Sequence, residues 1–359
     1  MRIGLMLHPV GEKEAGGLGR FVYMLAKTLV EAYPEHHFIL FSKKPLPSGM
    51  CFNAKNWENV SRGGGFLWID RVLFSGPRTD VTIFFTPMMP LFFRPRRSIV
   101  FALDFAYLAF AGTPREWIRA KLLFLLHAIT LWKATNIVAI SEETKQNAMR
   151  YFRLPSSKIT VAHIGYFPFS GERTPMEIPR PFFLFAGVLK ARKNVAGVIR
   201  AFARFHPSHP DFSLLIAGKR SGAYYESLVT LARALGAHDS VRFLGYVTDE
   251  ELAYLYTEAT GLVFPSFVEG FGMPVLEAMH LGAPVITSQT GALAEVAGDA
   301  ALLVDPHDPD HIARAMSALA DDAPLRESLR VKGRARSKQF SWAAAAVRLI
   351  EIARGLYKG

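Results

Sequence analysis

Residues 261–295 read GLVFPSFVEGFGMPVLEAMHLGAPVITSQTGALAE, and this stretch decides the fold. The apolar run at 261–264 predicts a buried strand. Pro274 suits the first turn of a helix, where a missing N–H costs nothing, and Gly282 suits the end of that helix. Residues 284–287 predict a second strand. A strand, a glycine-bearing loop, a helix and a strand in this order are typical of a doubly wound α/β sheet.

The loop and the helix start predict an anion site, because N–H groups and the helix dipole there favour a phosphate. The backbone N–H groups of 272–276 would line it. Glu269 stands in the loop and Glu277 about one turn into the helix. A carboxylate beside a phosphate is unfavourable unless it accepts hydrogen bonds, and sugar hydroxyls are the obvious donors. The pattern favours a nucleotide-sugar pocket. The alternative is an ordinary βαβ unit in which Glu277 interacts with the dipole and Glu269 is solvated.

Composition sets the size and class of the protein. At 359 residues, half of them hydrophobic, two domains are expected rather than one core. Cys51 is the single cysteine, so no intrachain disulfide can form. The opening residues RIGLMLH predict a strand rather than a signal peptide, and no apolar run reaches the length of about 18 residues needed to span a membrane. We therefore expect a cytoplasmic protein.

The net charge of +11 is unevenly distributed along the chain. Residues 1–174 hold 22 basic and 12 acidic residues, residues 175–329 hold 12 and 18, and residues 330–359 hold 8 and 1. This segregation suits an anionic partner such as a lipid pyrophosphate or an acidic membrane surface. A general solubility charge is the alternative. Nucleic-acid binding rests on charge alone, and no recognition motif supports it, so none is expected.

Two successive β/α alternations divide the chain. Strands are expected at 3–7, 38–41, 81–85, 98–103, 136–140, 182–186, 213–217, 241–244 and 301–304. Helices are expected at 117–133, 195–204, 224–235, 249–256 and 342–357, with a further helical stripe at 18–30.

The segment 166–181 carries four prolines and predicts a linker between the two alternations. We expect an α/β protein with two doubly wound, Rossmann-like domains, residues 1–170 and 180–339, and a ligand cleft between them. The C-terminal helix, 340–359, is expected to pack back on the first domain, whose charge it shares.

The segment PSFVEGFGMPVLEAM, residues 265–279, resembles the E-x7-E segment of the retaining glycosyltransferases of family 4, which have the GT-B fold. The likeness spans nearly the whole chain, is strongest over 182–305 and is weaker over 42–135. It implies that the donor binds mainly the second domain and the acceptor mainly the first. It also implies that Glu269 binds hexose hydroxyls and Glu277 the ribose. Retention without an obvious nucleophile implies front-face attack within an ion pair, helped by the leaving phosphate oxygen.

Further loops join the donor site in this resemblance. Lys193 takes the place of the lysine that counters the diphosphate charge, while Val188 stands where many relatives carry a further arginine. The alternatives are a flexible glycine loop at the first helix and a solvated basic turn at 190–194. The expected donor-binding residues are Gly16, Gly17, Arg192, Lys193, Gly218, Lys219, Tyr246, Val247, Glu269, Gly270, Phe271, Gly272, Met273, Pro274, Val275, Leu276 and Glu277.

On the acceptor side, Asp104 ends a predicted strand, and Leu103 stands where family members often carry a histidine close to the transferred sugar. Ser141 and Glu142 match a strand-end pair of the family, although a helix cap also explains them. From the resemblance we expect Glu269, Lys193 and Asp104 to be the catalytic residues.

No metal and no cofactor are expected beyond the nucleotide-sugar co-substrate. Asp308-Pro309-Asp310 spells a D-x-D motif of a different transferase fold, but helix capping explains it. The loop KARKN, 190–194, is similar to that of bacterial mannosyltransferases that use GDP-mannose in surface polysaccharide synthesis. Mannose is therefore the favoured hexose, and UDP- and dTDP-hexoses remain alternatives. The expected acceptor is a glycan or a lipid-linked pyrophosphate.

Aromatic residues stand beside basic ones at several places in the first domain, which suits a membrane interface. We expect this domain to dock peripherally on the inner face of an acidic membrane; ordinary core packing is the alternative. The residues concerned are Phe66, Trp68, Arg71, Phe92, Phe93, Arg94, Arg96, Arg97, Trp117, Arg119 and Lys121.

Two rival functions stay open on the sequence. An NAD(P)-dependent oxidoreductase would share the doubly wound core, but the glycine spacing at 8–19 is wrong for a dinucleotide fingerprint, and Lys43 and Lys44 stand where its ribose-binding acid belongs. A nucleotide-sugar-binding protein without catalysis is the second rival, because of Leu103. Turnover separates it from a transferase.

Overall fold

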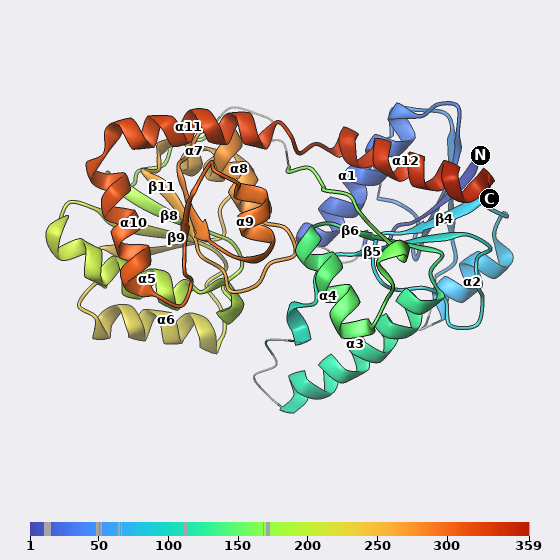
Figure 1. The fold of residues 1–359 in the computed structure, drawn as a ribbon, viewed down its shortest axis with the longest axis horizontal. Helices are drawn as coiled ribbons and strands as arrows, with labels where there is room; N and C mark the ends of the chain where they lie inside the picture. Colours follow the sequence, from blue (N-terminus) through green and yellow to red (C-terminus); the bar gives the residue numbers. More distant parts are fainter. Residues whose placement is uncertain are drawn as a thin grey trace. The chain divides into compact units, whose positions relative to one another are not determined.

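The computed structural model places the chain in two compact units, residues 1–165 with 341–359 and residues 166–340 (Figure 1). The structure describes residues 1–10, 16–47, 50, 52–63, 65, 67–108, 110, 114–167, 169 and 173–358.

The first unit contains a seven-stranded sheet in the order β3-β2-β1-β4-β5-β6-β7, with every pairing parallel. Parallel strands need crossover connections, and helices between the strands supply most of them. The elements are β1 Arg2–Met6, α1 Gly16–Ala32, β2 His37–Ser42, β3 Trp57–Ser61, α2 Trp68–Ser75, β4 Val81–Phe84, β5 Ser98–Ala102, η1 Ala106–Leu108, α3 Pro114–Lys133, β6 Asn136–Ala139, α4 Glu142–Phe152, η2 Ser156–Lys158, β7 Ile159–Val161 and α12 Trp342–Lys358.

The second unit contains a six-stranded parallel sheet in the order β10-β9-β8-β11-β12-β13. Its elements are β8 Phe182–Ala186, η3 Ala191–Lys193, α5 Val195–Phe205, η4 His206–Ser208, β9 Ser213–Ala217, α6 Ala223–Ala234, β10 Val241–Gly245, α7 Asp249–Glu258, β11 Gly261–Phe264, α8 Met273–Leu281, β12 Val285–Ser288, α9 Gly291–Ala297, β13 Leu302–Val304, α10 Pro309–Asp321 and α11 Ala323–Ser337.

The central strands of both sheets are buried on both faces, which explains why they appear in the sequence as continuous apolar runs. Every residue of β4, β5, β8, β9 and β11 is buried. Edge strands differ: all five residues of β3 are only partly buried. The strands predicted from apolar runs are therefore present, whereas β3 and the short β7 were not predicted, because neither forms such a run.

The last helix, α12, belongs to the first unit and packs against α1. Trp342 lies with its ring 6.0 Å from that of Phe21, and Arg354 forms an ion pair with Glu35 at 3.0 Å. At its start, the backbone of Gly165 runs so close to Trp342 that an added Cβ would lie 2.6 Å from the Trp342 nitrogen. The chain thus returns to the first unit through a contact that only glycine permits.

Two local expectations are corrected by the structure. Gly16 and Gly17 are not in a loop before the first helix but form the first turn of α1, while residues 11–15 lie outside the described part of the chain. Trp68, expected at a membrane-facing surface, is buried in the core around α2, and Phe93 packs against the same core. Phe66 lies outside the described residues.

Replacing Gly165 with alanine should lower the free energy of unfolding by about 1–3 kcal/mol, the usual penalty for overpacking. The matched control is Gly355→Ala in α12, where an added Cβ would meet nothing within 4 Å. Because alanine is the better helix former, that variant should be neutral or more stable by up to about 1 kcal/mol. Thermal melts of the two variants check this, and equal melting temperatures would contradict the close packing at Gly165.

Candidate functional site

The candidate site of the second unit lies where its sheet changes direction. The chain runs from β8 through β9 to β10 on one side, and from β11 through β12 to β13 on the other. The carboxyl ends of β8 and β11 therefore flank the topological switch point, the usual ligand site of an open α/β sheet. Arg192 and Lys193 follow β8, and the loop 265–272 follows β11.

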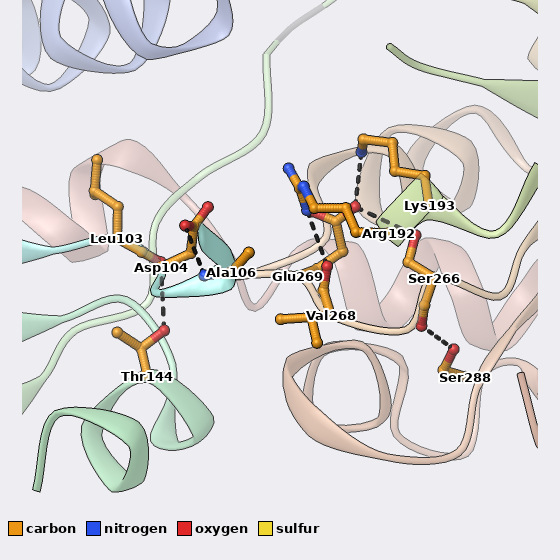
Figure 2. Close-up of polar contacts among 10 residues, drawn as sticks. All are labelled: Leu103, Asp104, Ala106, Thr144, Arg192, Lys193, Ser266, Val268, Glu269 and Ser288. Atoms are coloured by element: carbon orange, nitrogen blue, oxygen red, sulfur yellow. Dashed lines mark hydrogen bonds and ion pairs between the residues drawn. The ribbon is translucent and has the colours of Figure 1, made fainter. Parts of the chain in front are cut away.

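The carboxylate of Glu269 joins these two loops (Figure 2). Its Oε1 accepts from Lys193 Nζ at 2.7 Å and from Ser266 Oγ at 3.2 Å, and its Oε2 accepts from Arg192 Nη1 at 2.9 Å. The same Arg192 nitrogen donates to the carbonyl of Val268 at 2.9 Å. We call Glu269, Lys193 and Arg192 the charged cluster.

Lys193 is buried, the Glu269 side chain is 10% exposed and the Arg192 side chain is 21% exposed, so the charged cluster is largely removed from water. Burial raises the pKa of Glu269, but the neighbouring Lys193 and Arg192 outweigh burial and hold that pKa below its ordinary value. Two cations and one carboxylate leave a net charge of +1. A positive charge that is largely removed from water attracts an anion strongly, and this one lies at the carboxyl ends of β8 and β11.

The backbone around the cluster is tied down by Asn194, which sequence reasoning did not identify. Its φ of 57° is left-handed, a conformation that asparagine tolerates better than most residues. Its buried amide donates to the carbonyls of Pro265 and Pro306 at 3.1 and 2.6 Å, and Phe267 N–H bonds to Arg192 O at 2.8 Å. These bonds fix η3 against the loop that carries Glu269.

The ends of β9 and β10 extend the same rim. Gly218 N–H donates to Gly245 O at 2.8 Å, and a Cβ on Gly218 would lie 2.4 Å from Gly187 O, so the three strand ends are in close contact. Beyond them, Lys219 and Tyr246 are exposed and Val247 is half-buried. The structure therefore brings the predicted donor-binding residues of β8, β9 and β10 to one edge of one sheet.

The helix start at α8 corrects part of the predicted anion site. Gly272 caps the helix with a φ of 116°, and the N–H groups of Val275 and Leu276 already bond to its carbonyl. Pro274 has no N–H to give. The prediction that N–H groups over 272–276 bind an anion is therefore wrong at Pro274, Val275 and Leu276. Gly272 and Met273 are the predicted donors that remain. Gly270 and Phe271 form the loop before them.

Glu277 lies in α8 and is buried. The hydroxyl of the fully buried Tyr256, in α7, donates to its Oε2 at 3.3 Å. Burial, and then the Glu277 carboxylate, raise the pKa of Tyr256 well above its ordinary value, so this hydroxyl remains a donor. The sequence offered no signal for this pairing, because a tyrosine on an amphipathic helix usually indicates core.

In the first unit, Asp104 follows β5 and its Oδ1 accepts from Ala106 N–H at 3.3 Å (Figure 2). Leu103 O accepts from Thr144 Oγ1 at 3.3 Å. Ser141 caps α4 by accepting from Thr144 N–H at 3.1 Å, so the capping interpretation holds for it.

A polar pair not predicted from the sequence lies close to Asp104: Tyr107 OH and His127 Nδ1 are 2.9 Å apart. Burial lowers the pKa of His127 to about 4, which keeps the ring neutral near pH 7. Burial, and then the charge of Asp104, raise the pKa of Tyr107. His127 stands alone in an apolar helical pattern, which is why sequence reasoning assigned it no role.

Metal binding receives no structural support from the part of the chain that the structure describes. No group of three or more His, Cys, Asp or Glu side chains there could hold an ion. Asp308 accepts from the N–H groups of Asp310 and His311, so the D-x-D sequence is a helix cap.

Comparison with known proteins agrees with this geometry. Residues 172–336 match the family described as glycosyl transferases group 1. The match covers nearly the whole second unit, which is therefore similar to a glycosyl transferases group 1 domain. The resemblance to family 4 glycosyltransferases is thereby confirmed for the part of the chain that holds the charged cluster.

Two curated relatives and one solved structure extend the comparison. O-antigen chain mannosyltransferase B of Escherichia coli is 35% identical over 229 residues, which cover 59% of this chain and 58% of that protein. Serotype-specific mannosyltransferase WbdA of Escherichia coli is 32% identical over 233 residues, 61% of this chain and 28% of that protein. The matches thus span 58% and 28% of the length of these relatives, less than two thirds in both cases.

The solved structure of sucrose-phosphate synthase from Thermosynechococcus elongatus superimposes with a TM-score of 0.75 over 100% of this chain and 99% of that chain, at 21% identity. Because the sequence identity is only 21%, this structural likeness is evidence for the fold alone. Together with the two parallel sheets, it confirms the α/β GT-B fold class predicted from the sequence.

Replacing Glu269 with glutamine should lower the free energy of unfolding by about 3 kcal/mol at pH 7, because it leaves the buried Lys193 and the partly exposed Arg192 without their carboxylate. A carboxyl whose pKa is lowered on folding stabilises the protein above its ordinary value of 4.5 and loses that contribution as the pH falls through the folded value. The difference in melting temperature between wild type and variant should therefore shrink below pH 4.5.

The control is Glu351→Gln, which removes an exposed ion pair with Arg348 and should change the stability by less than about 1 kcal/mol. A difference for Glu269→Gln that stays constant with pH would contradict the assigned ion pairs.

Replacing Tyr256 with phenylalanine should lower the free energy of unfolding by about 1–3 kcal/mol, because a buried carboxylate loses a hydrogen-bond donor. Tyr254→Phe is the matched control on the same helix, since its hydroxyl bonds to the exposed Arg180 and its loss should cost under about 0.5 kcal/mol. Chemical denaturation measures both, and equal losses would rule out a special role for the Tyr256 hydroxyl.

Proposed function

We propose that this protein is a retaining hexosyltransferase that takes the sugar from a nucleotide-sugar and needs no metal. The observation that carries the proposal is the charged cluster, a largely buried site of net charge +1 at the switch point of a domain that matches the glycosyl transferases group 1 family. Lys193 and Arg192 supply the positive charge that a metal ion provides in other transferases, so they can stabilise a leaving diphosphate.

The roles of the two carboxylates follow from their surroundings. Glu269 faces the cations with both oxygens, and sugar hydroxyls would donate to its remaining lone pairs. Glu277, held by Tyr256, would accept from the ribose. Asp104, with Leu103 in the place of the family histidine, would serve the acceptor side.

In the proposed reaction, the bond between the sugar C1 and the diphosphate oxygen breaks, and the nucleoside diphosphate leaves with the electron pair. The acceptor hydroxyl oxygen forms the new bond to C1 on the same face. Its proton passes to the departing phosphate oxygen. Lys193 and Arg192 balance the charge that builds on that oxygen.

The names of the two Escherichia coli relatives favour mannose as the transferred hexose and a growing surface polysaccharide as the acceptor. GDP-mannose is the proposed donor.

The rival that a specific observation supports is a nucleotide-sugar-binding protein without turnover, since Leu103 provides no imidazole near the acceptor. Release of nucleoside diphosphate in the presence of acceptor distinguishes the two. We also propose a peripheral contact with an acidic membrane for delivery of a lipid-linked acceptor. Within the described residues, no helix is long and apolar enough to cross a membrane.

Replacing Glu277 with alanine should raise the KM for the nucleotide-sugar at least ten-fold, the usual value of one charge-assisted hydrogen bond. The assay follows nucleoside diphosphate release from GDP-mannose, UDP-glucose and dTDP-glucose in EDTA. Glu327→Ala on the exposed side of α11 is the control. Unchanged kinetics in Glu277→Ala would refute its assignment, and loss of activity in EDTA would refute metal independence.

A further inference from the structure

Tyr107 and His127 form a side-chain pair in the first unit that the proposed reaction does not use. Tyr107 OH lies 2.9 Å from His127 Nδ1, and the two rings meet edge to face, with centroids 5.3 Å apart at 85°. The ring of the buried Phe105 also meets that of His127 edge to face, at 6.4 Å. The pair joins η1 to α3, and one hydrogen bond with two neighbouring rings holds the imidazole in a defined orientation.

This pair lies next to Asp104, at the carboxyl end of β5. The Asp104 carboxylate lies against the start of η1, because its Oδ1 accepts from Ala106 N–H at 3.3 Å (Figure 2). Burial, and then the charge of Asp104, raise the pKa of Tyr107, so the two side chains are close. In the first sheet, β1 and β4 flank the switch point and β5 lies beside β4. Ligands of open α/β sheets bind at this edge.

Two polar atoms at this edge have no hydrogen-bond partner among the residues that the structure describes. One is Asp104 Oδ2, since only Oδ1 is bonded and no described cation pairs with the carboxylate. The other is His127 Nε2, since the bond to Tyr107 uses Nδ1. Where the protein offers no partner, such a group binds water or a ligand. Both atoms are therefore available to a ligand.

The pair is uncharged near pH 7, which limits what it can bind. Burial lowers the pKa of His127 to about 4, so the imidazole has one N–H and one lone-pair nitrogen. The raised pKa of Tyr107 keeps its hydroxyl protonated. If Tyr107 donates to Nδ1, then Nε2 carries the proton and donates; if Nδ1 donates to Tyr107, then Nε2 accepts. A ligand hydroxyl both donates and accepts, so it fits either form.

Asp104 makes this edge unfavourable for an anion. Its half-buried carboxylate has no ion-pair partner in the described part of the chain and stands beside a neutral pair, which leaves a local charge of −1. Like charges repel more strongly in a partly buried setting than in water. A hydroxyl, by contrast, can donate to Asp104 Oδ2. The edge thus suits an uncharged, hydroxyl-rich group, whereas the charged cluster of the second unit suits an anion.

We propose that Tyr107, His127 and Asp104 form a subsite for an uncharged sugar at the reactive end of the acceptor. His127 Nε2 hydrogen-bonds to one hydroxyl of that sugar, and Asp104 Oδ2 accepts from another. Tyr107 is a positioning residue, because it acts through the imidazole. The inference rests on the proposed hexosyl transfer and adds a class of acceptor, one that ends in a sugar without phosphate or carboxylate. The alternative is a pair that only ties η1 to α3.

Titration of an α-linked mannotriose, followed by ligand-observed NMR at pH 7, tests the subsite in the intact protein with and without GDP. The wild type should bind the trisaccharide. His127→Leu should raise the Kd about ten-fold and Tyr107→Phe about three- to ten-fold, the usual value of one hydrogen bond. His127→Gln, whose amide also donates and accepts, should bind within about two-fold of the wild type.

A double-mutant cycle separates the positioning role of Tyr107 from an independent contact. If Tyr107 acts through His127, then Tyr107→Phe should change the Kd by less than about two-fold in the His127→Leu background. Additive effects of the two substitutions would mean that the Tyr107 hydroxyl binds the sugar by itself, and its assignment as a positioning residue would be wrong.

The charge preference is tested with the same trisaccharide carrying a 6-phosphate on its terminal mannose. The wild type should bind it at least about ten-fold more weakly than the neutral sugar, because Asp104 repels the phosphate. Asp104→Asn should reduce this difference to about three-fold or less. Equal binding of the two sugars by the wild type would contradict the proposed class of acceptor.

Tyr151→Phe and His37→Leu are the matched controls. The Tyr151 ring lies 6.5 Å from that of Phe105, but its hydroxyl forms no hydrogen bond with a described residue. His37 begins β2, at the opposite edge of the same sheet. Neither substitution should change sugar binding, and thermal melts should show every variant folded.

Two further results would overturn the proposal. A wild type that binds no mannotriose, with or without GDP, would rule out the subsite. Variants of Tyr107 and His127 that melt at lower temperature but bind the sugar like the wild type would leave the pair a structural tie only. The thermal shift with GDP reports on the charged cluster and does not require His127, so the subsite can fail while nucleotide binding stands, and the reverse.

Discussion

The interaction on which the site depends is the buried carboxylate of Glu269 between Lys193 and Arg192. A carboxylate taken out of water is stable only if it is paired and hydrogen-bonded, and here both cations come from the loop after β8. The pair of ion pairs therefore ties the loop after β11 to the loop after β8. The cluster is stable without a ligand because Glu269 is paired with both cations. It still favours an anion, because one positive charge remains in excess.

The fold supplies the frame that this cluster needs. In the parallel order β10-β9-β8-β11, the carboxyl ends of the strands meet at one edge, and Gly218, whose Cβ would lie 2.4 Å from Gly187 O, lets β8 and β9 approach closely there. Asn194 fixes the loop after β8 by donating hydrogen bonds to the backbone carbonyls of Pro265 and Pro306. Tyr256 holds Glu277 in the same manner from α7. Both supporting groups are neutral and buried, and such groups position charged side chains without competing for a charged ligand.

The sequence predicted the fold class and most elements because buried parallel strands form unbroken apolar runs and because Pro274 and Gly282 mark the ends of α8. The E-x7-E motif also placed Glu269 correctly in the loop that follows β11. The sequence could not predict that Lys193 and Arg192 contact Glu269, since those contacts join residues 76 and 77 positions apart.

The predicted N–H donors failed at Val275 and Leu276, because these N–H groups bond to the Gly272 carbonyl within the first turn of α8. Trp68 was misplaced because a tryptophan next to cations looks alike in sequence whether it covers a core or faces a membrane.

The central claim, that the charged cluster binds the diphosphate of a nucleotide-sugar, is tested most directly by thermal shift in EDTA with GDP, UDP, dTDP, ADP and NADP. A ligand at 100 times its Kd adds about 2.7 kcal/mol to the stability. The account predicts that one nucleoside diphosphate raises the melting temperature and that Lys193→Ala abolishes the shift. A shift with NADP alone, or one that Lys193→Ala leaves intact, would contradict it.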